Sequence, residues 1–390
     1  MKIALIYDAV YPWVKGGGEK QLWELARTLH QRGHEVHCFG MQFWAGARSI
    51  EQEGVWLHGV CRARNLYDAK GKRARTQPLV FGCSVLRAFL RKEAGAFDVV
   101  DVIAFPYFAV LALACARAVR RHRWPLLVTW LEIWGPRYWR EYLGSGLMAR
   151  IGAAIERLCA KAADHHLCIS RHQASRLRVV LDVPEKKIDV VPRGVRVAAS
   201  GMQQHPGRIL YLGRLIDYKN TGTVINAMPA LVERFPGASL RIVGSGPDSG
   251  RLLDLARSSS AASAIEFLPP HGDSTDALRE IETASILVQP STREGQSLVV
   301  IEAQALGVPV VAARHDESAV TDFIDSGRTG LLVERWNDPG AWSEAIGSLL
   351  ADEAARTRIA GAARECARDY DWSKTVGPRM EELYLRLATR

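Results

Sequence analysis

The sequence predicts an α/β protein built from two doubly wound domains, and three observations support this class. Short β-rich runs alternate with helix-like segments along the chain, which is typical of parallel β-α-β units. The alternation pauses at residues 190–207, a stretch punctuated by Pro and Gly that has the composition of a linker. The 390 residues also exceed the roughly 150 residues of one typical domain. We therefore expect two domains of similar size with a cleft between them, and ligands at the carboxyl ends of the strands.

The first domain is expected over residues 1–195. It opens with a buried strand at 2–8, followed by a helix over 19–31 that carries apolar residues at helical spacing. The remaining elements continue the alternation, with strands at 34–40, 55–60, 97–103, 125–131 and 165–170, and helices at 109–119 and 147–162.

The second domain is expected over residues 205–368. A helix at 223–235 separates its first two strands, and helices fill the chain from Pro339 onward. Its expected strands lie at 208–215, 239–246, 265–270, 285–291, 308–314 and 329–333.

Composition excludes several classes of protein. Apolar residues make up 48% and charged residues 24%, which is the balance of a globular protein and excludes disorder, collagen and a disulfide scaffold. Seven cysteines without a C-x-x-C pair indicate reduced thiols. The longest apolar run, residues 107–116, is half the length of a membrane-spanning helix, and no secretory signal opens the chain. We expect a cytoplasmic protein, either soluble or peripheral at the inner membrane face.

Charge is divided unevenly along the chain. Residues 1–200 hold 31 Lys and Arg against 17 Asp and Glu, whereas the remainder holds 20 against 25. The first domain is therefore expected to attract anionic surfaces or anionic substrates.

Two candidate phosphate-binding segments follow predicted strands. In KGGGEK (15–20), Gly16 and Gly17 have no side chains, so another group can come close to their backbone. The helix that follows offers free N–H groups to an anion. The P-loop spacing is absent, so a tight turn is the alternative. In YLGRLIDYKN (211–220), Arg214 and Lys219 could converge on a diphosphate, or could be two solvated surface charges.

Two further candidate segments also follow predicted strands. VGSGPDSG (243–250), with Gly244, departs from the dinucleotide fingerprint and is either a phosphate-facing turn or a plain β-α turn. In STREGQSLVVIEAQALGVPVVA (291–312), Glu294 and Glu302 are eight residues apart around a short helix expected to begin near Ser297. The two carboxylates could accept hydrogen bonds from the hydroxyls of a polyol while the helix amides hold a phosphate. Alternatively, Glu294 is only an acidic residue at a helix N-terminus and Glu302 only an exposed residue of that helix.

The combination of GGGEK, GRLIDYKN, VGSGP and EGQSLVVIEAQALGVPVV resembles the retaining glycosyltransferases of family 4. These enzymes have the GT-B fold, two Rossmann-like domains facing a central cleft. YDWSKTV (370–376) resembles the start of the terminal helix that in this family packs back on the first domain, which assigns residues 369–390 to that helix.

The resemblance implies roles for individual residues. Arg214 and Lys219 match the basic pair that neutralises the donor diphosphate, Glu302 matches the glutamate on the ribose, and Glu294 the glutamate on the donor sugar. Gly16 and Gly17 match the glycines that close over the diphosphate. The remaining matches are the loop residues that hold phosphate and sugar, namely Gly295, Gln296, Ser297, Leu298 and Val299, and the base-contacting backbone near Phe267–Pro270, which includes Leu268.

The implied activity is that of a metal-independent hexosyltransferase with no cofactor beyond its nucleotide-sugar substrate, with UDP-sugar favoured over GDP-sugar. Metal is not expected, because the D-x-D string at Asp369–Asp371 leads into a helix and His165 and His166 have no carboxylate at ligand spacing. The alternatives are a sugar-nucleotide 2-epimerase, or a catalytically silent homologue that only binds nucleotide sugar. A phosphorylase would need a Schiff-base lysine that no segment resembles.

The chain departs from the family pattern at two places. Leu131, followed by Glu132, stands where a histidine usually contacts the donor sugar, so that Glu132 is either an acceptor contact or base, or the partner of a nearby Arg. Arg193 and Arg196 replace the usual Asn and Asp, in a region where acceptor and sugar are expected.

The acceptor is expected to bind the basic first domain. Residues 135–161 interleave aromatic and aliphatic side chains with Arg and Lys, so the segment either lies on an anionic membrane near a lipid-linked acceptor or is an ordinary amphipathic helix. No nucleic-acid-binding motif is present in the sequence.

Overall fold

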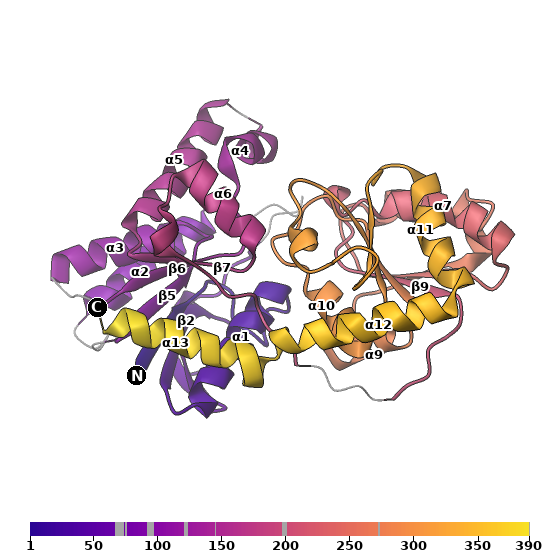
Figure 1. Ribbon diagram of the computed structural model, residues 1–390. Helices are drawn as coiled ribbons and strands as arrows, with labels where there is room; N and C mark the ends of the chain where they lie inside the picture. The colour runs from indigo at the N-terminus through magenta and orange to yellow at the C-terminus, as the bar shows by residue number, and fades with distance from the viewer. Residues whose placement is uncertain are drawn as a thin grey trace. The chain divides into compact units, whose positions relative to one another are not determined.

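A computed structural model describes residues 1–66, 74, 76–91, 97–120, 124–144, 146–196, 201–271 and 274–389 (Figure 1). The chain divides into two compact units, each an α/β structure around one sheet. The first unit comprises Met1–Gly194 and Trp372–Arg390, and the second comprises Val195–Asp371. The terminal segment thus joins the first unit at Trp372, three residues later than the sequence predicts.

The first unit contains an eight-stranded sheet with the order β3-β4-β2-β1-β5-β6-β7-β8. Within the described residues its pairings are parallel, except that β3 runs antiparallel to β4. The strands are β1 (Lys2–Ile6), β2 (Glu35–Gln42), β3 (Ser49–Gln52), β4 (Val55–Arg62), β5 (Val99–Ile103), β6 (Leu126–Trp130), β7 (His165–Cys168) and β8 (Ile188–Val190).

Helices cover both faces of this sheet, which explains why its central strands are mostly apolar. Ala4 and Ile6 of β1 point into the core formed with α2, α3, α5 and α6, while Ile3 and Leu5 face α1 and α13. Figure 1 shows the yellow α13 lying along α1, far from it in sequence. The helices are α1 (Gly17–Gln31), α2 (Gln77–Leu90), α3 (Phe108–Arg120), α4 (Gly135–Leu143), α5 (Gly146–Ala162), α6 (Arg171–Leu181) and α13 (Gly377–Ala388).

The second unit contains a six-stranded parallel sheet with the order β11-β10-β9-β12-β13-β14. Alternate residues of β9 again enter two cores, Ile209 and Tyr211 on the side of α7 and α11, and Leu210 on the side of α10. The strands are β9 (Arg208–Leu212), β10 (Ser239–Val243), β11 (Ile265–Leu268), β12 (Ile286–Gln289), β13 (Val310–Ala313) and β14 (Leu331–Val333). The helices are α7 (Thr221–Arg234), α8 (Ser249–Arg257), α9 (Ser274–Glu282), α10 (Leu298–Leu306), α11 (Pro339–Ala351) and α12 (Glu353–Ala367).

Several features differ from the sequence-based expectation, which did not include α6 or β8 of the first unit. The expectation omitted β3, which forms a hairpin with β4 through Glu53 and Gly54, both at positive φ as a tight hairpin turn requires. It also omitted α2, and it began the terminal helix too early. Trp372–Val376 forms a short π-helical turn, and α13 itself begins at Gly377.

None of the helices in the described ranges combines the length and the apolar character needed to cross a lipid bilayer.

Candidate functional site

The candidate residues of the second unit lie at one edge of its sheet. Arg214 comes two residues after β9, Gly244 directly follows β10, Leu268 is the last residue of β11, and Glu294 lies between β12 and α10. These four strands are adjacent and parallel, so their carboxyl ends meet at the same edge. This is the edge at which open α/β sheets bind ligands.

An ion pair joins two of the candidates across this edge. Lys219 ends the short 3-10 turn Asp217–Lys219, and its Nζ lies 2.5 Å from Oε1 of Glu294. The amide of Gln289, the last residue of β12, donates to the same carboxylate oxygen. Glu294 is 9% exposed, so this carboxylate is buried but paired. The sequence motif predicts a diphosphate contact for Lys219 but gives no sign of its contact with Glu294.

Backbone contacts hold the Glu294 loop from two sides. Thr292 donates its backbone N–H to Tyr218 O over 2.9 Å, and Ala319 donates its backbone N–H to Glu294 O over 2.9 Å. Arg293 pairs with Glu317 at 2.9 Å, which fixes the loop a second time to the segment after β13. The carboxylate of Glu294 is therefore presented from a loop with little freedom.

The E-x7-E segment has the predicted arrangement, with the helix beginning one residue later than expected. α10 starts at Leu298, and its N-cap Ser297 makes no side-chain capping hydrogen bond. The first amides of a helix have no intrahelical acceptors and carry the positive end of the helix dipole. Glu302 lies half-buried on the second turn, while Gly295 and Gln296 lie half-buried in the loop before the helix.

The glycines after β10 are required by the packing of two backbone segments. A Cβ at Gly244, which has φ +156°, would lie 1.9 Å from Gly213 O, and one at Gly246 would lie 2.1 Å from Leu215 O. The loops after β9 and β10 thus touch backbone to backbone. The hydroxyl of Tyr211 donates to Arg214 O over 2.8 Å, and burial raises the pKa of that hydroxyl to about 12. Arg214 itself is exposed.

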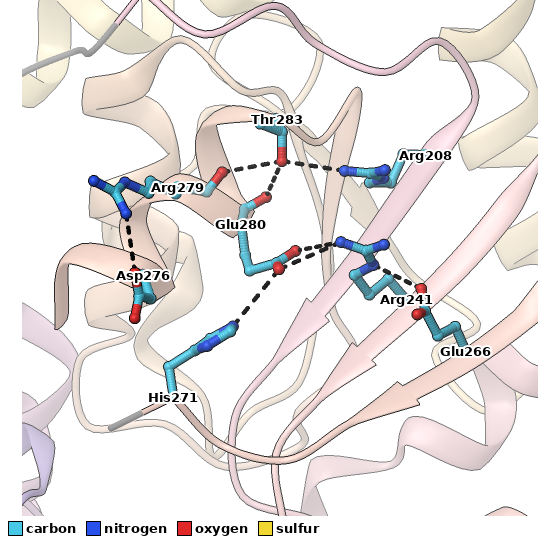
Figure 2. A network of polar contacts seen from close by, with 8 residues as sticks. All are labelled: Arg208, Arg241, Glu266, His271, Asp276, Arg279, Glu280 and Thr283. Atoms are coloured by element: carbon cyan, nitrogen blue, oxygen red, sulfur yellow. Dashed lines mark hydrogen bonds and ion pairs between the residues drawn. The ribbon is translucent and has the colours of Figure 1, made fainter. Parts of the chain in front are cut away.

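A polar network supports the base of the same sheet (Figure 2). Arg241 of β10 pairs with Glu266 of β11 and with Glu280 of α9, each at 2.9 Å. His271, in the loop that follows Leu268, lies 3.7 Å from Glu280. The network ties α9 to β10 and β11 and holds both ends of the Phe267–Pro270 loop.

The candidates of the first unit lie around the N-terminus of α1. Gly16 is the N-cap, in an extended conformation, and a Cβ there would lie 2.3 Å from Oε2 of Glu19. The missing side chain therefore makes room for the buried Glu19 carboxylate. Leu131, which stands at the usual histidine position, has its Cδ1 3.4 Å from the Cβ position of Gly18. Gly17 is the first residue of the helix.

A buried carboxylate holds the segment that carries Glu132. Glu156 of α5 accepts the backbone N–H groups of Trp134 and Gly135 over 2.8 and 3.0 Å. It also accepts the hydroxyl of Tyr107 over 2.9 Å and the indole N–H of Trp139 over 3.0 Å. Glu156 is fully buried. The pKa of Tyr107 is raised well above its usual value, by burial first and then by the charge of Glu156.

Sequence reasoning missed Glu156. The one sequence feature that could have identified Glu156 is its position on the buried face of α5, one turn from the buried Gly152 and Cys159. A lone carboxylate on the buried face of a helix requires partners, because an uncompensated buried charge is costly.

Arg193 occupies a different environment from the one expected. It is 3% exposed and lies within the first unit beside Asp101 and Tyr384. Burial lowers the pKa of Arg193, and the charges of Asp101 and Tyr384 offset this lowering only in part. Asp101 accepts from the hydroxyls of Thr129 and Tyr384, both over 2.6 Å. The departure at Arg193 is therefore accounted for by a buried ionic cluster rather than by an acceptor or sugar contact. Arg196 is exposed.

No cluster of metal-ligating side chains occurs among the residues that the structure describes. The two histidines singled out in the sequence serve in packing. His166 is buried, accepts the indole N–H of Trp130 over 3.0 Å, and has its pKa lowered to about 3, mainly by burial. His165 contacts Asp189.

Two family models match the chain. Residues 15–199 match the model described as Glycosyltransferase Family 4, and residues 206–352 match the model described as Glycosyl transferases group 1. Over 388 residues the chain is 28% identical to the D-inositol 3-phosphate glycosyltransferase of Nocardiopsis dassonvillei, covering 93% of this chain and 87% of the relative. Against other relatives of the same name the match spans about half of their length.

Solved structures resemble the whole chain. The sucrose-phosphate synthase of Thermosynechococcus elongatus has a TM-score of 0.79 at 20% identity and covers 100% of this chain and 99% of that one. Anabaena HepE, in a complex with UDP-glucose, has a TM-score of 0.73 at 16% identity and covers 99% and 100%. At these identities the likeness establishes the GT-B fold.

Proposed function

Because the chain belongs to glycosyltransferase family 4, we propose that it is a retaining hexosyltransferase that moves a hexose or hexose derivative from a nucleoside-diphosphate sugar to a hydroxyl group. UDP is the favoured nucleotide. The observation that carries this proposal is the gathering of Arg214, the Lys219–Glu294 pair and the N-terminus of α10 at one sheet edge. The UDP-glucose complex of the structural neighbour HepE supports the same class of donor.

In the proposed site, the charge of each group determines which part of the donor it binds. Arg214 and Lys219 neutralise the diphosphate, the amides from Gly295 to Val299 hold phosphate and sugar, and Glu302 accepts from the ribose hydroxyls. In the first unit, Gly16 and Gly17 are assigned to the diphosphate as well. Two cations and a helix terminus supply the positive charge that a metal would otherwise bring, so the proposed reaction needs no metal.

The ion pair gives Lys219 two roles in this proposal. Its ammonium group has three donors, of which the Glu294 carboxylate uses one at 2.5 Å. In the proposed complex the Lys219 ammonium group also donates to a phosphate oxygen, while the second carboxylate oxygen of Glu294 accepts from a sugar hydroxyl. Glu294 therefore links the position of the sugar to the position of the cation that stabilises the leaving group.

In the proposed transfer the bond from the sugar C1 to the diphosphate oxygen breaks as a bond from C1 to the acceptor oxygen forms on the same face. The acceptor proton passes to the departing diphosphate. The protein then acts by positioning and by stabilising charge, with no protein nucleophile. Glu132, held by the Glu156 network, is proposed as an acceptor contact.

The acceptor is proposed to be anionic or lipid-linked, because α4 and α5 expose a mixed apolar and basic surface. Leu147 and Leu158 are 69% and 54% exposed, and Met148 and Ile151 are exposed with them. The cations beside them are Arg140, Arg150, Arg157 and Lys161. Such a surface fits the interface of an anionic membrane, where aliphatic side chains enter the headgroup region and cations meet lipid charge.

The membrane surface is tested by flotation with anionic and zwitterionic vesicles. We expect binding to anionic vesicles only, and loss of binding in Arg150→Glu/Arg157→Glu. Arg178→Glu/Arg257→Glu, which reverses two exposed arginines elsewhere, serves as the control. Equal binding to both kinds of vesicle, or equal loss in both variants, would contradict this surface.

The donor site is tested with a panel of nucleotide sugars and with Glu294→Gln. We expect free UDP to be released by the wild type, turnover to fall by at least about a hundredfold in Glu294→Gln, and UDP affinity measured by calorimetry to change little. Glu344→Gln, at an exposed carboxylate of α11, is the control. A new sugar-nucleotide peak would indicate epimerisation, stabilisation without turnover would indicate a binding protein, and absence of nucleotide affinity would refute the site.

A further inference from the structure

A pocket of about 770 Å³ lies in the first unit between α2 and the strands β2 and β4. Lys2, the first residue of β1, and Phe97, which precedes β5, mark its position toward the beginning of the central strands. The first-unit candidates Gly16, Gly17 and Glu132 are not among its lining residues. The pocket is therefore separate from the site proposed above, and its volume falls in the range of small-molecule sites.

Among the described residues that line this pocket there are five cations and no carboxylate: Lys2, Arg48, Arg62, Arg87 and Arg91. Arg87 and Arg91 are one turn apart at the end of α2. Lys2 pairs with Glu35 at 2.9 Å. Among the ion pairs formed by described residues, none involves the other four. Gathered cations without acidic partners favour the binding of an anion.

The floor of the pocket is aromatic and held by a chain of hydrogen bonds. His37 and His58 stack with ring centroids 5.1 Å apart, and Phe39 stacks on His58 at 4.6 Å. Because the Glu35 carboxylate only accepts, Nε2 of His37 donates to it over 2.8 Å, and Nδ1 of His37 accepts from Nε2 of His58 over 2.8 Å. Nδ1 of His58 in turn accepts from the hydroxyl of Ser49 over 2.8 Å.

This chain occupies all four ring nitrogens, so the imidazoles offer faces rather than donors to a ligand. Burial lowers the pKa of both histidines, that of His58 to about 4, and it outweighs the Glu35 carboxylate, which acts in the opposite direction on His37. The floor is consequently neutral at pH 7, and the charge of the pocket lies in its Lys and Arg side chains.

We propose that this pocket binds a phosphorylated small molecule, with its phosphate held by the arginines and its ring seated on the imidazole and phenyl floor. Arginine is suited to this task, because its planar fork donates two parallel hydrogen bonds to phosphate. A concave pocket favours a small ligand over an anionic membrane, which would require a flat or convex surface. The site also accounts for part of the positive charge that distinguishes the first 200 residues.

The proposal is tested by calorimetry with glucose 6-phosphate and with inorganic pyrophosphate at low salt, in the presence of saturating UDP, which occupies the proposed donor site. We expect saturable binding to the wild type and binding at least about tenfold weaker to Arg87→Glu/Arg91→Glu, because two charge-assisted contacts are lost. Arg178→Glu/Arg257→Glu is the control of equal charge change and should bind as the wild type does. Circular dichroism checks that each variant is folded.

Three outcomes would overturn the proposal: no binding of either probe to the wild type, equal weakening in both variants, or undiminished binding in Arg87→Glu/Arg91→Glu. Binding of anionic vesicles alone, lost in the pocket variant, would also overturn it, in favour of a membrane contact. Arg87→Glu/Arg91→Glu should retain the affinity of the wild type for UDP, because these two arginines lie outside the proposed donor site. A failure of the donor site therefore stays distinguishable from a failure of this pocket.

Discussion

Replacement of Glu156 by Gln should destabilise the first unit more than any neutralisation of a surface carboxylate. The two carboxylate oxygens accept four hydrogen bonds, two each, from Tyr107, Trp134, Gly135 and Trp139. A carboxamide keeps one oxygen and turns an NH₂ group toward the other two donors. Two buried donors then lose their acceptor, and at roughly 1–3 kcal/mol for each the expected cost is about 2–6 kcal/mol.

Two measurements check this value. Urea unfolding followed by tryptophan fluorescence reports on the first unit, because Trp130, Trp134 and Trp139 all belong to its core. Hydrogen exchange of the backbone amides of Trp134 and Gly135 reports directly on the two bonds, and their protection should fall in Glu156→Gln. Glu185→Gln, at a carboxylate that is 83% exposed, is the control and should cost less than about 1 kcal/mol.

A loss of stability below about 1 kcal/mol in Glu156→Gln, together with unchanged exchange at Trp134 and Gly135, would contradict this role of Glu156. That result would mean that the carboxamide satisfies the same donors, and that Glu156 does not hold the segment carrying Glu132.

Three further predictions concern packing, pH and the buried ionic cluster. Gly244→Ala should cost at least about 3 kcal/mol in urea unfolding, because its Cβ would meet Gly213 O at 1.9 Å, whereas Gly250→Ala on α8, with nothing within 4 Å, should be neutral or slightly stabilising. His166 has its pKa lowered to about 3 in the folded state, so the unfolded state binds more protons below pH 6.5 and stability should fall as the pH drops from 6.5 toward 3. His166→Asn should make the slope of unfolding free energy against pH shallower by up to about 1.4 kcal/mol per pH unit, and an unchanged slope would count against a neutral His166. Tyr384→Phe should cost about 1–3 kcal/mol in thermal or urea unfolding by removing the hydroxyl that Asp101 accepts over 2.6 Å, and a neutral effect would show that Arg193 and Thr129 suffice.

Most strands of the two sheets could be predicted because they are buried on both faces. Segments such as 2–8 and 285–291 are apolar runs bounded by polar or turn residues, and such runs are recognisable without any partner. β3 could not be found this way, because SIEQ is a short, half-polar edge strand that depends on its hairpin with β4. α2 did carry a signal, with Pro78 in its first turn and apolar residues at Phe81, Val85 and Phe89.

The position of the candidate site at one edge of the second sheet was predictable, whereas the contacts between its side chains were not. Motifs that follow strands β9, β10 and β12 must share an edge once the sheet is parallel, so the order of the motifs along the chain suffices for that inference. The Lys219–Glu294 contact spans 75 residues of sequence and depends on the short turn after β9. The cationic pocket was equally hidden, because Lys2, Arg48 and Arg91 come from three unrelated segments.

The return of the last nineteen residues to the first unit has a consequence for synthesis. Trp372, Met380 and Tyr384 belong to the same core as Ile3 and Leu5, so the part of that sheet face which α13 covers stays exposed until α13 has been synthesised. The second unit is a continuous stretch, Val195–Asp371, and can fold while the chain is still being made. The first unit begins to be translated before the second but is completed after it, and chaperones would meet it with the place of α13 beside α1 still empty.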